Sequence, residues 1–190
     1  MANIEERVET LVKDSIENLG YSLYDVQYVK EGQDYYLRIF IEKPNGSIDL
    51  NDCEKVNNEI NDLLDEADYI KEQYFLEVSS TGLEKVLRKD KHLQDNIGEE
   101  VQVNLFKPVE IMGKKQKEIV GVLKDFDKET MTIEVLLDNY CEKKKKQNNK
   151  KDIKGNKERM EENPNQEKQI NIERKNISQI KTVFDWDSLE

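Results

Sequence analysis

The sequence is poor in the residues that most often carry catalysis, redox chemistry or metal binding. Its 190 residues include one histidine, His92, and two cysteines, Cys53 and Cys141. The cysteines stand far apart in unlike sequence, so we expect free thiols rather than a disulfide or metal framework. A lone histidine in a charged stretch is expected to be solvated. No two of the eight glycines have Gly-x-x-Gly spacing, and no glycine-rich loop precedes Lys-Ser or Lys-Thr. We therefore expect no catalytic residue, no metal and no cofactor.

Long apolar runs are also missing. No stretch approaches the length that spans a membrane, and the N-terminus lacks the basic start and apolar block of a signal peptide. Charged residues make up 37% of the chain and hydrophobic residues 36%. This composition predicts a cytoplasmic protein with no membrane partner. The sequence has no long apolar patch that would indicate an obligate dimer, so we expect a monomer.

The net charge of −11 is unevenly distributed. Residues 1–90 hold 10 Lys and Arg against 21 Asp and Glu, whereas residues 143–159 hold nine basic and two acidic residues. An acidic body repels phosphate backbones and attracts cationic proteins. One interpretation is that the acidity only provides solubility. The sharper one is a basic protein partner, with nucleic-acid contacts confined to local basic patches.

The first part of the chain, residues 1–82, alternates helical and strand patterns. The expected elements are a helix after the N-cap Asn3 that Gly20 ends, strands at Tyr21–Val29 and Tyr35–Glu42, a helix beginning at Asp49 and a strand at Tyr74–Val78. Each helix has one apolar stripe to bury. The order α-β-β-α-β therefore predicts a three-stranded sheet with both helices on one face. Cys53 lies on the second stripe and is expected to be a small core residue.

The remainder, residues 83–190, is predicted to be a second domain. After a helical turn at Lys91–Ile97, short strands are expected at Glu100–Phe106, Glu118–Phe126, Thr130–Leu137, Gln169–Glu173 and Ile177–Val183. Several short strands with tight turns favour a small closed β-barrel. A Lys-rich segment at about 138–168 has too little apolar content to fold and is expected to be a flexible insertion. The predicted fold class is α+β.

The junction between the two parts carries the most distinctive local sequence. The apolar strand stops at Ser79 and Ser80, and Gly82 permits a positive φ. Thr81 and Glu84 have the spacing of a capping box, which predicts one helical turn there. These features favour a structural joint over an anion-binding nest.

Several segments in this order resemble the RimP family of bacterial ribosome maturation factors. The matching pieces are Leu19–Tyr21, Asp25–Tyr28, Leu37–Gly46, Ile48–Cys53, Leu76–Ser80 with Gly82 and Leu83, and Ile97–Val101. The resemblance implies an N-terminal α/β domain and a C-terminal Sm-like or SH3-like barrel. The family usually has proline at the positions of Thr81 and Val86. The Lys-rich insertion is not typical of it, so no family role transfers to that segment.

The resemblance also implies a non-enzymatic assembly factor that binds the immature small (30S) ribosomal subunit. Its implied partners are ribosomal RNA and a basic protein, ribosomal protein twelve of the small subunit. The candidate contact or junction residues are Asp25, Ser79, Ser80, Gly82, Lys85 and Arg88.

The alternative is a general RNA-binding module that acts through the barrel and a basic loop. The candidate RNA-contacting residues of that loop are Lys143, Lys144, Lys145, Lys146, Lys150 and Lys151. A solvated charge run and an RNA contact explain this loop equally well.

Overall fold

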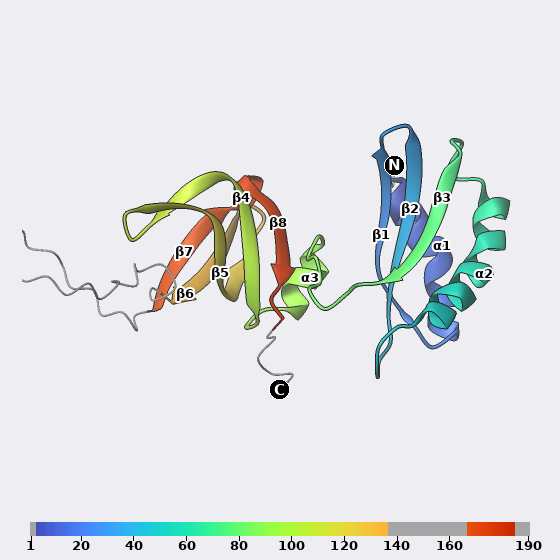
Figure 1. Ribbon diagram of the computed structural model, residues 1–190, viewed down its shortest axis with the longest axis horizontal. Coiled ribbons are helices and arrows are strands. Elements are labelled where there is room, and N and C mark those ends of the chain that lie inside the picture. Colours follow the sequence, from blue (N-terminus) through green and yellow to red (C-terminus); the bar gives the residue numbers. More distant parts are fainter. Residues whose placement is uncertain (1–2, 137–166, 185–190) are drawn as a thin grey trace, which may run out of the picture. The chain divides into compact units, whose positions relative to one another are not determined.

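The computed structural model describes residues 3–136 and 167–184. The chain divides into two compact units, Met1–Leu83 and Glu84–Glu190, which are shown in Figure 1. None of the helices in the described segments is long and apolar enough to cross a membrane. The predicted insertion at 138–168 lies outside the described residues except for its last two positions. Those two, Glu167 and Lys168, belong to a strand, and the insertion itself stays a prediction.

The first unit has the predicted α-β-β-α-β order. Its elements are α1 (Ile4–Asn18), β1 (Ser22–Glu31), β2 (Asp34–Glu42), α2 (Leu50–Ala67) and β3 (Tyr74–Ser80). The sheet order is β1-β2-β3, with β1 antiparallel and β3 parallel to the central strand. A two-residue turn joins β1 to β2, whereas the parallel connection from β2 to β3 requires the α2 crossover. The α+β class is confirmed.

Side-chain caps fix the start of both long helices. The Asn3 side chain accepts a hydrogen bond from the backbone N–H of Glu6 at 2.8 Å, and the Glu6 carboxylate accepts from the N–H of Asn3. Asp49 and Asp52 form the same reciprocal pair at 2.9 Å in each direction. Each pair satisfies two N–H groups that have no partner inside the helix. Both predicted helix starts are therefore confirmed.

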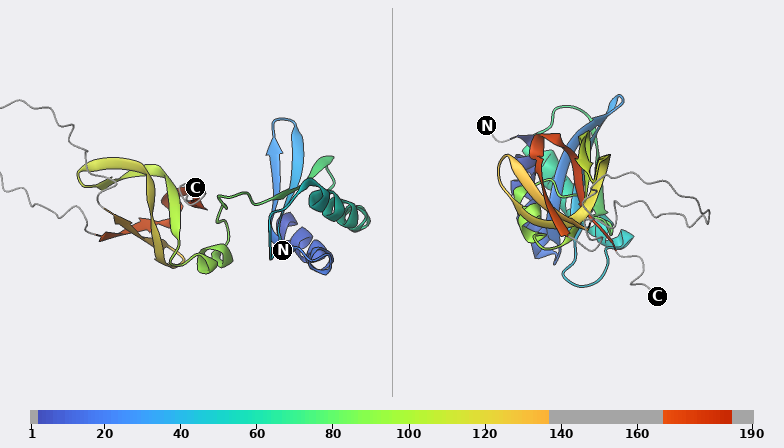
Figure 2. Two further views of the ribbon diagram at one scale, coloured as in Figure 1. Left: turned by 60° about the horizontal axis from the view of Figure 1, so that its bottom comes forward. Right: turned by 90° about the vertical axis from the view of Figure 1, so that its left-hand side faces the viewer.

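Both helices lie on one face of the three-stranded sheet, as predicted (Figure 2). Leu37, Ile39 and Ile41 of β2 point into that side and are fully buried. Strand alternation puts the intervening residues on the opposite face, where no described helix of this unit lies. We call this second surface the open face. Its residues are Asp25, Gln27, Val29 and Glu31 of β1, Tyr36, Arg38, Phe40 and Glu42 of β2, and Phe75, Glu77 and Ser79 of β3.

The second unit is a short helix followed by a five-stranded antiparallel sheet. Its elements are α3 (Asp90–Asp95), β4 (Glu100–Ile111), β5 (Lys114–Phe126), β6 (Thr130–Leu136), β7 (Glu167–Glu173), a 3₁₀ turn (Arg174–Asn176) and β8 (Ile177–Thr182). The strand order is β7-β6-β5-β4-β8. Residues Leu136 and Glu167, at the ends of β6 and β7, are register partners.

The described strands form an antiparallel sheet in which closure of the predicted barrel is not detected. β7 pairs with β6 and β8 pairs with β4, and no ladder joins β7 to β8 within the described residues. Alternating apolar positions predict strands and their buried face. Closure depends instead on strand tilt and stagger, which that pattern does not specify.

Three of these strands are longer than predicted, β7 by two residues and β4 and β5 by more. β4 continues past Phe106 and turns into β5 through Met112 (φ 53°) and Gly113 (φ 73°), a two-residue hairpin. Pro108 would interrupt a regular ladder, but the β4–β5 register shifts between Asn104 and Val109 and accommodates it.

Candidate functional site

The predicted contact residues are divided between the two units. Asp25, Ser79, Ser80 and Gly82 belong to the first unit, and Lys85 and Arg88 belong to the second. The basic loop Lys143 to Lys151 lies outside the described residues. Across residues 3–136 and 167–184, no group of three or more His, Cys, Asp and Glu side chains could hold a metal ion.

Asp25 is a buried acid, with only 1% of its surface exposed. It stands opposite Phe40 at a register irregularity in β1, and its Oδ2 accepts a hydrogen bond from Nε2 of Gln27 at 3.1 Å. Asp25 is therefore not a solvated surface carboxylate. Its assignment as a contact residue stays a prediction.

Ser79 and Ser80 are part of β3 rather than the start of a turn. They pair with Phe40 and Ile41 of β2. With the first turn of α2 they line a shallow groove, in which Leu50 is 87% exposed. The two serines continue the strand because the parallel ladder to β2 satisfies their backbone groups.

The capping box predicted at Thr81 and Glu84 does not form. The Thr81 hydroxyl donates instead to the Glu42 carboxylate at 3.1 Å, which ties the end of β3 to the end of β2. Gly82 follows with φ +75°, as expected for a glycine in a sharp turn. Leu83 and Glu84 then form a bend rather than a helical turn, so the helix prediction was wrong.

Lys85 is held by the last strand of its own unit. Its backbone N–H donates to the Thr182 hydroxyl and its carbonyl accepts from the Thr182 N–H, both at 2.9 Å. Val86 forms an isolated bridge with Lys181, and Leu87 donates to the Ile180 carbonyl at 2.9 Å. These bonds use backbone groups and fix where the second unit begins.

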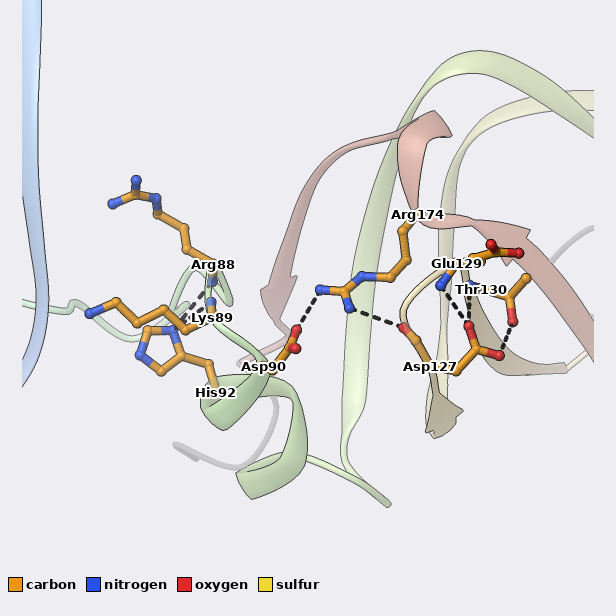
Figure 3. Close-up of polar contacts among 8 residues, drawn as sticks. All are labelled: Arg88, Lys89, Asp90, His92, Asp127, Glu129, Thr130 and Arg174. Carbon is orange, nitrogen blue, oxygen red and sulfur yellow. Dashed lines mark hydrogen bonds and ion pairs between the residues drawn. The ribbon is translucent and has the colours of Figure 1, made fainter. Parts of the chain in front are cut away.

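His92 is buried, with 4% of its surface exposed, so the expectation of a solvated histidine was wrong. Its Nδ1 accepts from the backbone N–H groups of Arg88 and Lys89 at 3.3 and 3.4 Å (Figure 3). The imidazole thus holds the chain that enters α3. Its neighbours in sequence are charged, so periodicity gave no sign of this burial.

Arg174 joins three turns of the second unit (Figure 3). Its guanidinium donates to Asp90 at 2.6 Å and to the Asp127 carbonyl at 3.0 Å. The Asp127 carboxylate in turn accepts from the N–H groups of Thr130 and Glu129, each at 2.7 Å. These N–H groups, Thr130 first, lower the pKa of Asp127. The cluster is best explained as a fastening of turns, and nothing in it resembles a nucleophile with its base.

The open face of the first unit carries a charge cluster and an aromatic pair. Glu31 and Glu77 bind the guanidinium of Arg38 from two sides, at 2.8 and 2.7 Å. They raise the pKa of Arg38, and Arg38 lowers that of Glu31. The rings of Tyr36 and Phe75 lie 5.5 Å apart between centroids. Alternation in β2 predicts that Arg38 and Phe40 share a face, but only the strand register shows Glu31 and Glu77 on either side of Arg38.

A second polar cluster lies at the start of α2. The Asp52 carboxylate accepts from the Tyr21 hydroxyl at 2.7 Å and pairs with the Lys43 ammonium at 2.5 Å. Lys43, the Asp49 N–H and the Tyr21 hydroxyl together lower the pKa of Asp52 from its usual 3.8 to about 2.

This cluster predicts a specific acid sensitivity. Because the pKa of Asp52 is lowered by folding, its stabilising contribution is present above pH 3.8 and is lost as the pH falls towards 2. We expect the unfolding midpoint of the wild type to fall more steeply over that range than that of Asp52→Asn. Urea unfolding at a series of pH values measures this. Glu59→Gln on the exposed side of α2 is the control and should follow the wild type, whereas parallel curves for wild type and Asp52→Asn would contradict the assignment.

The fold and these clusters define a class. The chain is a two-unit α+β protein in which polar groups hold helix starts and turns, and one sheet face of its first unit carries no described helix of that unit. Residues 11–84 match the family model described as the RimP N-terminal domain. This part of the chain is therefore similar to the N-terminal domain of the RimP ribosome maturation factors, a family of non-catalytic assembly factors.

The match begins within α1 and ends just after the junction. It thus includes all the resembling segments up to Gly82 and Leu83. The resemblance at Ile97–Val101 lies beyond it and stays a prediction.

Proposed function

We propose that this protein binds the immature small ribosomal subunit and assists its late assembly in the cytoplasm, without covalent chemistry. The observation that supports this is the RimP N-terminal domain at residues 11–84, since the family is one of ribosome maturation factors. In this proposal the chain acts as a monomer and holds a late folding state of the subunit.

The charge of the first unit supports a protein partner. Residues 1–90 carry a net charge of −11, which repels phosphate and attracts a basic ribosomal protein. By resemblance, that protein is ribosomal protein twelve of the small subunit, with ribosomal RNA as a further contact. Asp25, Ser79, Ser80, Gly82, Lys85 and Arg88 remain the proposed contact or junction residues.

Sedimentation of cell lysate through a low-salt gradient tests the proposal. We expect the protein to migrate with free small subunits, because a maturation factor is bound to particles that have not yet joined large subunits. A protein that stays at the top of the gradient would contradict the proposal.

The second candidate, a general RNA-binding module, is favoured by the run of nine basic residues at 143–159. The same gradient with residues 143–159 deleted separates the two functions. General RNA binding predicts loss of most co-sedimentation, whereas subunit recognition predicts a modest loss. If the run contacts four phosphates, affinity should fall on the order of a hundredfold between about 50 and 200 mM salt.

A further inference from the structure

The open face of the first unit carries an excess of negative charge. Apart from the buried Asp25, it holds the three carboxylates of Glu31, Glu42 and Glu77 and the single guanidinium of Arg38, a net charge of −2. The side chains of Glu31 and Glu77 are 54% and 45% exposed. A surface of this charge repels the phosphates of RNA and favours a cationic protein.

Apolar area lies beside these carboxylates. Phe75 is 54% exposed, and Tyr36, whose ring it contacts, is half-buried. Exposed aromatic rings next to carboxylates are common anchors in protein interfaces, because they bury a large area at a low cost in side-chain entropy.

Arg38 shows how this face holds a guanidinium group. Its guanidinium lies 5.2 Å from the centroid of the Tyr36 ring while Glu31 and Glu77 bind its nitrogens. Phe75 and Glu77 present the same two chemistries, a ring and a carboxylate, on the neighbouring strand. An incoming arginine would meet a similar environment on that strand.

We propose that the open face is a docking surface for an extended, arginine-rich segment of a basic protein, with Phe75 and Glu77 as its main contacts. The inference deepens the proposed function and rests on it for the source of the partner, a basic ribosomal protein. It assigns the protein contact to β1, β2 and β3 rather than to the junction residues.

A binding measurement on the full-length protein tests this. The probe is a short fluorescent peptide in which arginine alternates with glycine, and fluorescence anisotropy reports its affinity. We expect Phe75→Ala and Glu77→Gln each to weaken binding by on the order of tenfold, since exposed anchors typically contribute that much. The matched controls are Glu59→Gln on α2 and Phe106→Ala in the second unit, where Phe106 is 64% exposed. They should change the affinity by less than about twofold.

Other outcomes overturn the inference. Equal losses in the face variants and their controls would show that the peptide responds only to overall charge. If a single-stranded RNA oligonucleotide competes with the peptide for the wild type but not for Phe75→Ala, the face binds RNA. If deletion of residues 143–159 tightens peptide binding in the wild type but not in Phe75→Ala, the chain's own basic segment occupies the open face.

The gradient experiment separates this inference from the proposed function. If Phe75→Ala and Glu77→Gln co-sediment with small subunits as the wild type does and also bind the peptide normally, the face is not the contact and the function stands. If the wild type fails to co-sediment, the function fails, whatever the peptide shows. Thermal unfolding of each variant, expected to match the wild type, excludes loss of the fold as the cause.

Discussion

Replacing Ile39 with alanine should lower the free energy of unfolding of the first unit by about 2–5 kcal/mol. Ile39 is fully buried in the central strand β2 and pairs with Val26 on one side and Val78 on the other. Truncation removes apolar contacts within the buried cluster of the first unit and leaves a cavity, because a close-packed core relaxes only partly around a deletion.

Hydrogen exchange measured by mass spectrometry localises this loss on the full chain. Amides of β1, β2 and β3 should exchange faster in Ile39→Ala, while those of β4 to β6 keep their wild-type rates. Ile39→Val is the graded control and should cost about 0.5–1.5 kcal/mol. Unchanged protection in β1, β2 and β3 would show that the described core is wrong.

Gly121→Ala should destabilise the second unit by about 1–3 kcal/mol through overpacking. Gly121 lies in β5 between β4 and β6, opposite Val101. A Cβ atom there would approach the Glu134 carbonyl oxygen to 2.4 Å and the Ile133 Cγ2 to 2.9 Å. The carbonyl belongs to the neighbouring strand β6, so it cannot retreat without disturbing the β5–β6 ladder.

Urea unfolding followed by circular dichroism measures the effect, and hydrogen exchange should place it in β5 and β6. Lys117→Ala in the same strand is the control, since Lys117 is exposed and the change should leave stability within about 0.5 kcal/mol of the wild type. A Gly121→Ala variant as stable as Lys117→Ala would contradict the packing described around β5.

Local sequence signals predicted most of the first unit. Asn3 and Asp49 mark both helix starts because capping is a short-range interaction between residues three apart. The alternation of Leu37, Ile39 and Ile41 predicts the buried side of β2 because strand side chains repeat every two residues.

Features that depend on distant residues were missed. Ser79 and Ser80 extend β3 because of their ladder to β2, some forty residues earlier in the chain. The Thr81 hydroxyl likewise donates to Glu42, a distant residue that the fold brings close, instead of forming a local helix cap. His92 is buried in the fold, although the charged residues next to it in sequence predict an exposed position.

The candidate site was predictable only in part. Composition indicated an acidic first unit with a basic partner, yet it did not distinguish one acidic residue from another. The pairing of Glu31 and Glu77 around Arg38 requires the register of three strands, since these residues are separated by 7 and 39 positions in sequence. The junction, whose sequence is the most distinctive, contributes strand pairing and turns.

The register at the ends of β6 and β7 has a practical consequence. Leu136 and Glu167 face each other across the β6–β7 ladder, so these two strand ends lie side by side. The strand order requires only that the connecting segment join these two neighbouring strand ends. The entropic cost of closing a flexible loop rises by only about 0.6 kcal/mol for each doubling of its length. We therefore expect this position to tolerate insertions. A label, an affinity tag or a small folded protein inserted between Leu136 and Glu167 should leave all five strands in register.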